Sequence, residues 1–442
     1  MDNFAGQTQH KVSTLAEPQH FTAQLAPRPV TVADTGLGEL FLADLITKHL
    51  FEAGVLDLAE LSERLCLAGS LLETLLAFLR QEGYVEVRGR SPDSVLLRYA
   101  LTDRGRANAM DAVSRDGYIG PAPVPLKDYV KLVEAQSVKH VVVTREKVRA
   151  TFADTVIRES LLDRLGPAVH SGRAMFIYGD PGTGKSFICR RLSRLLGDYV
   201  LVPHAIAVNE NVIQYFDPTV HHRVTDGISA AGVNLNQGHD PRFVLCRRPV
   251  VITGGELTLD MLELQFDAVT RRYRAPLQLL ANNGMMVIDD LGRQRVAPID
   301  LFNRWIVPLE EKHDFLALQS GQHITVPFDV VLAFSTNLDP LELADEAFLR
   351  RIGYKIRFDN PNRDEYTAIW KQVCASRGVE YNPTTLEFLF DELYKRENVP
   401  LLPCHPRDLI DLAQDFARYR DQAGLSTEAL QWAWDNYFVN LN

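Results

Sequence analysis

The feature that most constrains the fold is the stretch FIYGDPGTGKS, residues 176–186, in which an apolar run enters a glycine-rich turn. The residues AMFIY predict a buried strand, and the amphipathic run FICRRLSRLL after the turn predicts a helix. The spacing of Gly179, Gly184, Lys185 and Ser186 fits the pattern G-x-x-x-x-G-K-[ST]. In that pattern, backbone N–H groups surround a phosphate at the positive end of the helix. We therefore expect an α/β fold that binds a nucleotide phosphate at this loop.

Each residue type in the loop has its own task. Gly182 and Gly184 let the backbone approach anionic oxygens without a Cβ in the way. Lys185 supplies a positive charge for the β- and γ-phosphates, and the hydroxyl of Ser186 is a ligand for Mg²⁺. The predicted nucleotide-binding residues are Gly179, Pro181, Gly182, Thr183, Gly184, Lys185 and Ser186.

Length and composition predict a multidomain protein that folds in water. At about 100–200 residues per domain, 442 residues suggest about three domains. The sequence has 46% hydrophobic and 24% charged residues, shows no apolar run of membrane-spanning length, and begins without a secretory signal, so we expect a cytoplasmic protein without membrane insertion. The five cysteines include no C-x-x-C pair, which argues against a disulfide framework or zinc ribbon. A net charge of −10 gives no general attraction to nucleic acid.

The N-terminal third contains a predicted flexible tail, residues 1–36, and a small domain, residues 37–118. Three helical patterns are followed by two strand-like segments and a last helix, an order that resembles a winged helix. Thirteen acidic and nine basic residues in 37–118 make a poor phosphate-facing surface. We therefore favour a protein-docking or oligomer-organising role for this domain over DNA binding.

The next segment, residues 119–150, is predicted to be a linker. Pro121, Pro123 and Pro125 in GPAPVPLKDYV disfavour a regular helix and favour a semi-rigid connection. The segment after it leads into the phosphate loop, and its apolar residues Val156 and Ile157 are candidates to cover an adenine.

A second chemical motif is GMMVIDDLGRQ, in which Met285–Ile288 form a buried-strand pattern that ends in Asp289 and Asp290. Carboxylates at the C-terminal end of such a strand emerge where α/β sheets bind their ligands. Asp289 is then predicted to hold Mg²⁺, and Asp290 to orient or deprotonate an attacking water.

A third motif follows another apolar strand pattern, residues 330–334, which ends in Ser335, Thr336 and Asn337. The amide of Asn337 is a candidate to hold the attacking water opposite Asp290. The segment before this strand predicts a hairpin that turns at Ser320 and Gly321.

Together with AFLRRI and HPRDL, these motifs resemble AAA+ ATPases, a family of ring-forming remodellers, from about residue 150 to the C-terminus. The resemblance implies ATP and Mg²⁺ as cofactors, a homo-oligomer in the form of a hexameric ring, and a P-loop sheet core with a C-terminal helical lid. It also implies that Asn337 is sensor 1, Arg407 is sensor 2, and Arg350 or Arg351 is the arginine finger that reaches a neighbouring subunit. Arg351 is preferred because it directly precedes an apolar residue, and the hairpin is similar to that of the MoxR-like group.

The AAA+ region is predicted to comprise a nucleotide-binding domain, residues 151–360, and a helical lid, residues 361–442. A β-rich insertion is expected around 208–275. Its aromatic residues Tyr215, Phe216 and Tyr273 are candidates to grip a substrate, although packing within the insertion is favoured. Three arginines (271, 272 and 274) and two histidines (221 and 222) are interpreted as surface groups.

The resulting prediction is an ATPase, converting ATP and water to ADP and phosphate, that remodels or assembles a protein partner in a chaperone-like manner. Two alternatives stay open at this point. One is a DNA-acting motor or helicase loader that uses residues 37–118 to bind duplex. The other is a nucleotide-regulated assembly scaffold with low turnover. Asp290 is one methylene shorter than the Glu found in many members of the family that the chain resembles, which leaves the turnover rate open.

Overall fold

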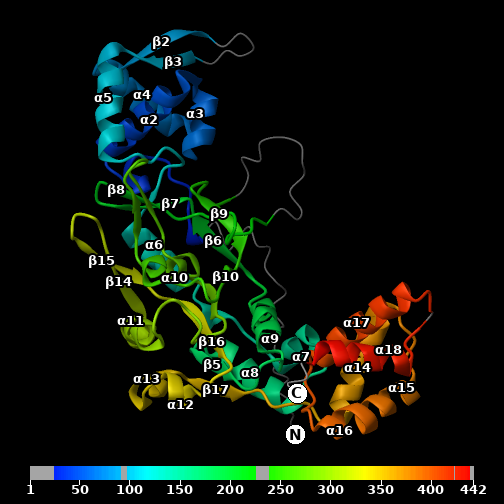
Figure 1. Ribbon diagram of the computed structural model, residues 1–442. Helices are drawn as coiled ribbons and strands as arrows, with labels where there is room; N and C mark the ends of the chain where they lie inside the picture. The colour runs from blue at the N-terminus through cyan, green and yellow to red at the C-terminus, as the bar shows by residue number, and fades with distance from the viewer. Residues whose placement is uncertain (1–23, 91–96, 225–237, 423, 439–442) are drawn as a thin grey trace, which may run out of the picture.

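The computed structural model describes residues 24–90, 97–224, 238–422 and 424–438. A small N-terminal domain lies at one end of the molecule, an α/β core lies at the other end, and a helical C-terminal domain packs beside that core (Figure 1). No helix within the described ranges combines the length and the apolar character needed to cross a membrane. The predicted fold class, a parallel α/β core with a helical C-terminal domain and a preceding α+β domain, is confirmed.

The core is a five-stranded parallel sheet with the order β10-β13-β16-β5-β17. Its strands are β5 (Met175–Tyr178), β10 (Val250–Thr253), β13 (Gly284–Ile288), β16 (Val330–Thr336) and β17 (Tyr354–Arg357). Strand β16 lies between β5 and β13, with Phe334 in register with both Phe176 and Ile288. This order brings the ends of the three predicted motif strands together at one edge of the sheet.

Helices cover both faces of this sheet, as its apolar strands require. One face packs against α7 (Arg145–Thr151), α8 (Glu159–His170) and α9 (Lys185–Leu192). The other packs against α11 (Pro298–Glu311) and α13 (Glu346–Arg351), with the short helices α10 (Leu277–Leu280) and α12 (Pro340–Leu343) nearby. Neighbouring residues along β5 alternate between the two cores: Met175 and Ile177 face α8 and α9, whereas Phe176 faces α11.

A second sheet lies between the core and the N-terminal domain, with the order β11-β12-β8-β7-β4 (Figure 1). Its strands are β4 (Val124–Pro125), β7 (Ala205–Val208), β8 (Asn211–Gln214), β11 (Gln265–Asp267) and β12 (Arg272–Arg274). Beside it, β6 (Tyr199–Pro203) pairs with β9 (Phe243–Arg247), and η4 (Leu259–Leu262) precedes β11. Strand β10, inside the predicted insertion 208–275, belongs to the core sheet instead, because it pairs in parallel with β13.

The predicted linker, 119–150, is largely folded, which corrects the expectation of a semi-rigid connection. The prolines end at Pro125, and the helix α6 (Leu126–Ala135) begins directly after it, where a preceding proline costs no helical hydrogen bond. Strand β4 pairs with β7, and η2 (Val138–His140) leads towards α7. The side chain of Asp329 accepts hydrogen bonds from the Ser137 hydroxyl at 2.7 Å and the Val138 N–H at 2.8 Å, which fastens this segment to the start of β16.

The hairpin predicted before β16 is present as β14 (His313–Ala317) and β15 (His323–Pro327). It extends from the core towards the second sheet (Figure 1). The Gln319 N–H donates to the Tyr273 hydroxyl at 3.1 Å, and the Asn209 amide donates to Gln322 at 3.4 Å. The tip of the hairpin is therefore attached to the second sheet.

The N-terminal domain has the predicted helices and hairpin. After η1 (Ala33–Thr35) come α2 (Glu39–Ala53), β1 (Val55–Asp57), α3 (Leu58–Leu65), α4 (Gly69–Gln81), β2 (Val85–Arg90), β3 (Leu97–Leu101) and α5 (Asp103–Arg115). The three strands form an antiparallel sheet with β3 in the middle, and leucines of α2, α3 and α4 fill the core beneath it. The residues that join β2 to β3 lie outside the described ranges.

This domain is held against the second sheet by buried polar contacts. The carboxylate of Asp116 lies 3.7 Å from the ammonium of Lys48 and accepts from the Val212 N–H at 2.9 Å. Arg242, which is 4% exposed, pairs with Asp240 and donates to the Thr35 carbonyl at 2.9 Å. Contacts of this kind fix the orientation of the N-terminal domain, because an unpaired buried charge is costly.

The C-terminal domain is a bundle of helices around an aromatic core. Its helices are α14 (Arg363–Arg377), α15 (Pro383–Phe388), the π-helical turn η5 (Leu389–Tyr394), α16 (Lys395–Glu397), α17 (His405–Tyr419) and α18 (Thr427–Tyr437). The predicted capping box of Asn362 and Glu365 and the predicted cap of Ser426 are both present.

Around the second sheet, the aromatic side chains pack as the sequence analysis favoured, whereas His221 is not the surface group that it expected. Tyr215 and Tyr273 are 3% and 5% exposed and pack in the second sheet's core with Phe216. Arg271 and Arg272 donate to backbone carbonyls of the N-terminal domain. His221 is buried, accepts from the Asp217 N–H at 3.0 Å, and burial lowers its pKa to about 4. The sequence around single residues such as these has no periodic pattern from which their tertiary contacts could be predicted.

The contact between Gly117 and the second sheet leaves no room for a side chain, because a Cβ there would lie 1.8 Å from the Thr270 carbonyl oxygen. We expect Gly117→Ala to destabilise the chain by about 2–3 kcal/mol, as overpacking of a rigid contact does. Thermal unfolding should show a lower Tm. Gly38→Ala is the matched control, since nothing lies within 4 Å of that position. An unchanged Tm for Gly117→Ala would contradict tight docking of the N-terminal domain.

Candidate functional site

The phosphate loop joins the end of β5 to the start of α9, as predicted. Gly179 has a φ of 142°, and a Cβ there would lie 2.2 Å from the Phe358 carbonyl oxygen, so only glycine fits. Gly182 has a φ of 83°, and a Cβ there would lie 2.8 Å from the sulfur of Cys404 in the helical domain. The loop is therefore pressed between the core and the helical domain at two points.

Lys185 is buried beneath this loop. Its ammonium donates to the carbonyl oxygens of Gly179 at 2.8 Å and Asp180 at 2.7 Å, and to the Thr183 hydroxyl at 3.3 Å. Burial lowers its pKa, while the nearby carboxylate of Asp290 acts in the opposite direction. A cation held in this way is a strong point charge for a phosphate that enters the loop.

Ser186 and Asp289 link the loop to the second motif. The Ser186 hydroxyl donates to Asp289 Oδ1 at 2.9 Å, although the two residues lie on α9 and after β13. A hydroxyl and a carboxylate are hard oxygen donors of the kind that Mg²⁺ takes, with the remaining positions left to phosphate oxygens and water. These two side chains fit the magnesium site that the sequence predicts.

Asp290 and Asn337 face each other across the ends of β13 and β16. Asn337 Nδ2 lies 3.5 Å from Asp290 Oδ1. The Thr336 hydroxyl donates to the Leu291 carbonyl at 2.8 Å and the Leu291 N–H donates to the Ser335 carbonyl at 2.8 Å, which holds the two turns together. Asp290 has a φ of 50°, a left-handed conformation that Asp tolerates better than most residues. The left-handed conformation therefore suits Asp at position 290.

The predicted arginines fall into two groups. Arg407 lies near the start of α17, lines the cavity described below, and pairs with Asp408 at 2.8 Å, which raises its pKa. Arg350 and Arg351 lie at the end of α13 and do not line that cavity. Arg351 is paired with Glu310 at 2.6 Å, whereas the side chain of Arg350 is exposed. The structure thus brings Arg407 to the phosphate loop and leaves Arg350 and Arg351 apart from it.

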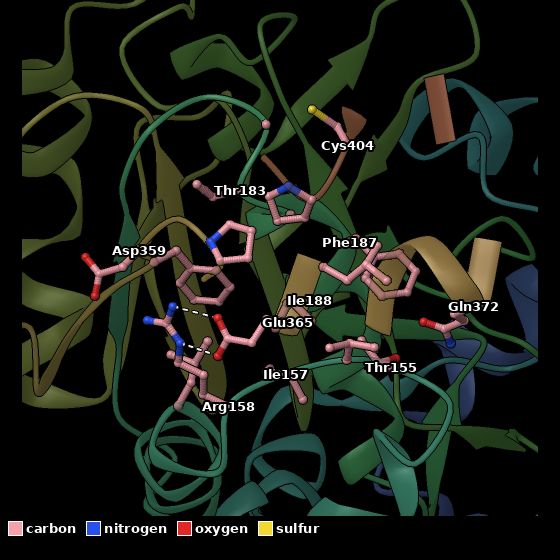
Figure 2. Close-up of a pocket in the computed structure, with 18 of the residues that line it drawn as sticks. Thr155, Ile157, Arg158, Thr183, Phe187, Ile188, Asp359, Glu365, Gln372 and Cys404 are labelled. Atoms are coloured by element: carbon pink, nitrogen blue, oxygen red, sulfur yellow. Dashed lines mark hydrogen bonds and ion pairs between the residues drawn. The ribbon is translucent and has the colours of Figure 1, made fainter. Parts of the chain in front are cut away.

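A cavity of about 560 Å³ opens beside the phosphate loop, between the core and the helical domain (Figure 2). Its lining includes the loop residues 182–184 and the segment 154–158, with Val156 and Ile157 where the sequence analysis expected them. The helical domain contributes Ile369, Gln372 and Val373 from α14. A cavity of this size and mixed polarity matches a small-molecule site.

An ion pair closes one side of the cavity. Arg158 Nε donates to Glu365 Oε1 at 2.6 Å and Arg158 Nη2 donates to Glu365 Oε2 at 2.8 Å, and Nη2 also donates to the Asn360 carbonyl at 2.8 Å (Figure 2). This pairing lowers the pKa of Glu365. The bidentate pair joins the start of α8 to α14 and so holds the helical domain over the core.

Sequence reasoning missed several residues of this cavity. Glu365 was recognised as part of a capping box, but its partner Arg158 is 207 residues away and no local pattern connects the two. Phe187 directly follows the motif and could have been noticed as an aromatic residue on the first turn of α9. Gln372 carries no sequence signal, because its place depends on how the helical domain sits.

Comparison with known proteins does not identify a function for the chain. Residues 362–436 match a family described as a domain of unknown function (DUF8689). No curated protein matches the sequence. Among solved structures, the chain is similar to the RuvB Holliday junction branch migration motor of Thermotoga maritima, with 14% identity and a TM-score of 0.37, over 63% of this chain and 69% of that chain.

NtrX from Brucella abortus is similar at 12% identity with a TM-score of 0.40, over 66% of this chain and 58% of that chain. NtrX in complex with ADP gives 12% identity and a TM-score of 0.38, over 64% of this chain and 56% of that chain. Function therefore has to be inferred from the site's own geometry.

The Arg158–Glu365 pair makes a pH-dependent contribution to stability. We expect Glu365→Gln, which keeps the cap on α14, to lower stability by about 1 kcal/mol at neutral pH. Because pairing lowers the pKa of Glu365 in the folded chain, the contribution is present above the ordinary carboxyl pKa and disappears as the pH falls through the lowered value. Hydrogen exchange of α14 measures the effect. Equal exchange in the two proteins at pH 7 would show that the pair does not hold the helical domain.

Proposed function

We propose that this chain is a Mg²⁺-dependent ATPase of the AAA+ type. The observation that carries the proposal is the hydrogen bond of 2.9 Å between Ser186 and Asp289, which joins the phosphate loop to the carboxylates after β13. Asn337, at the end of the strand between them, completes the cluster. Phosphoryl transfer to water needs these groups: a phosphate cradle, a metal site and a carboxylate and amide that position water.

Each residue then has a role in hydrolysis. Lys185 binds the β- and γ-phosphate oxygens, and Ser186 and Asp289 hold Mg²⁺, which neutralises charge on those oxygens when it is bound. Asp290 accepts the proton of the attacking water, and Asn337 orients that water. Arg407 approaches the phosphates from the helical domain.

We also propose that the chain works as a homo-oligomeric ring, taken as a hexamer, in which a neighbour completes each site. The exposed side chain of Arg350, away from the cavity of its own subunit, supports it as the finger that stabilises transition-state charge in trans. The pairing of Arg351 with Glu310 supports a bracing role for Arg351, which reverses the preference stated from the sequence.

A protein partner fits the N-terminal domain better than DNA does. Residues 37–118 carry thirteen acidic and nine basic residues, and Arg88 is paired with Glu86 at 2.8 Å. A surface of this charge offers few cations for phosphate contacts. We therefore propose chaperone-like remodelling or assembly of a protein client, with the N-terminal domain, interpreted as winged-helix-like, as the docking module.

Two variants test the ATPase directly. Lys185→Ala should raise the Kd for MgATP roughly tenfold or more, because it removes a buried charge from the phosphate site. Asp290→Asn should keep binding and lower kcat by roughly 10²–10⁴-fold, as loss of a general base does. Isothermal titration and phosphate release measure the two effects. Lys131→Ala is the matched control, because that lysine side chain is 74% exposed and lies on α6. The proposal is overturned if the wild-type protein binds no nucleotide. If it binds ATP but shows negligible hydrolysis at every protein concentration, the ATPase proposal fails and the nucleotide-regulated scaffold is favoured instead.

Mixing two inactive variants tests the shared site. Arg350→Ala should lower kcat by roughly 10³-fold or more with little change in ATP binding. When Arg350→Ala and Lys185→Ala subunits are mixed, the intact loop of the first meets the intact arginine of the second, so phosphate release should partly recover. Arg274→Ala, an exposed arginine on β12, is the control. Absence of recovery in a mixture shown to co-assemble would contradict a finger in trans.

A further inference from the structure

A large aromatic side chain lies exposed inside the nucleotide cavity. Phe187, the residue after Ser186 on the first turn of α9, is 54% exposed and lines the cavity (Figure 2). The apolar residues that follow it on the same helix, Ile188 and Leu192, are buried in the core. Exposure of a phenyl ring at this position leaves apolar surface available to a flat ligand.

Arg191, one turn later on α9, contacts this ring. Its guanidinium carbon lies 5.7 Å from the centre of the Phe187 ring and 6.0 Å from the centre of the Phe152 ring. Nε donates to the Thr151 carbonyl at 2.9 Å, and the guanidinium also pairs with Asp154, so the side chain is only 12% exposed. A cation fixed between two aromatic rings restrains Phe187 in one orientation, since both contacts are favourable.

The surroundings of Phe187 suit a heteroaromatic ring. Val156 and Ile157 line the core side of the cavity, and Ile369 and Val373 line it from α14. The backbone of the phosphate loop, residues 182–184, borders the same cavity. One ligand that places phosphates on the loop and an apolar flat group among these side chains has the form of a nucleoside triphosphate.

We propose that Phe187 stacks on the nucleobase of the bound nucleotide and that Arg191 is the positioning residue that holds the phenyl ring for this contact. The inference rests on the proposed function. It adds a source of affinity for the base that is separate from the phosphate contacts of Lys185. Stacking on an aromatic side chain favours any base, because every base has a π-face.

The test compares two ligands that differ in the base. Phe187→Ala should raise the Kd for MgATP roughly 5- to 150-fold, the range expected for loss of one base–aromatic stack, and leave the Kd for Mg-tripolyphosphate unchanged. Phe187→Tyr, which keeps the ring, should bind MgATP within about twofold of wild type. Arg191→Met should raise the Kd for MgATP less than Phe187→Ala does, because the ring remains but is less restrained.

Phe315→Ala is the matched control, since that phenyl side chain is 48% exposed on the hairpin strand β14. Equal affinity of Phe187→Ala and wild type for MgATP overturns the stacking inference, as does a parallel loss of tripolyphosphate binding in a variant with unchanged Tm. If wild-type protein binds neither ligand, the proposed function itself fails. Phe187→Leu keeps the apolar bulk but removes the aromatic ring, so it separates stacking from simple apolar contact. An affinity for MgATP near that of Phe187→Ala supports stacking, and an affinity near that of wild type overturns it.

Discussion

One hydrogen bond, from the Ser186 hydroxyl to Asp289 Oδ1, connects the two halves of the candidate site. Ser186 lies on the helix after β5, and Asp289 follows β13, with β16 between these two strands. The bond therefore depends on the register of three neighbouring parallel strands, because their C-terminal ends must lie side by side at the same edge of the sheet. Burial of the strands on both faces fixes this register, because neighbouring residues on each strand pack into opposite cores. The turns that carry Asp290 and Asn337 depend on the same alignment.

The N-terminal domain is attached to the rest of the chain by the second sheet. Buried charges such as Arg242 and the close contact at Gly117 hold the domain against β12 and the segment before β4. The second sheet is in turn joined to the core side by contacts such as the hydrogen bond of 2.9 Å from the Tyr215 hydroxyl, just after β8, to the Leu279 carbonyl of α10.

The helical domain contributes to the site through contacts that differ from those within the core. Cys404 packs against the phosphate loop at Gly182, and Glu365 pairs with Arg158. Both contacts involve residues that line the cavity, as does the exposed Phe187. Among the described residues, polar contacts such as the Arg158–Glu365 pair help to hold this interface, so it is a part of the structure suited to respond to a ligand.

The sequence by itself determined the local chemistry: the strand, loop and helix around Lys185, the paired carboxylates, the strand that ends at Asn337, and the capping box of Asn362. These features are set by residues close together in the chain, so periodicity and spacing reveal them. Only the tertiary structure decided that β10 joins the core sheet, that the predicted linker forms α6, and that Tyr215 and His221 are buried. Only it paired Arg158 with Glu365 and left Arg350, not Arg351, without an ion pair among the described residues. Such outcomes depend on contacts between distant segments, which a single sequence does not encode as a local pattern.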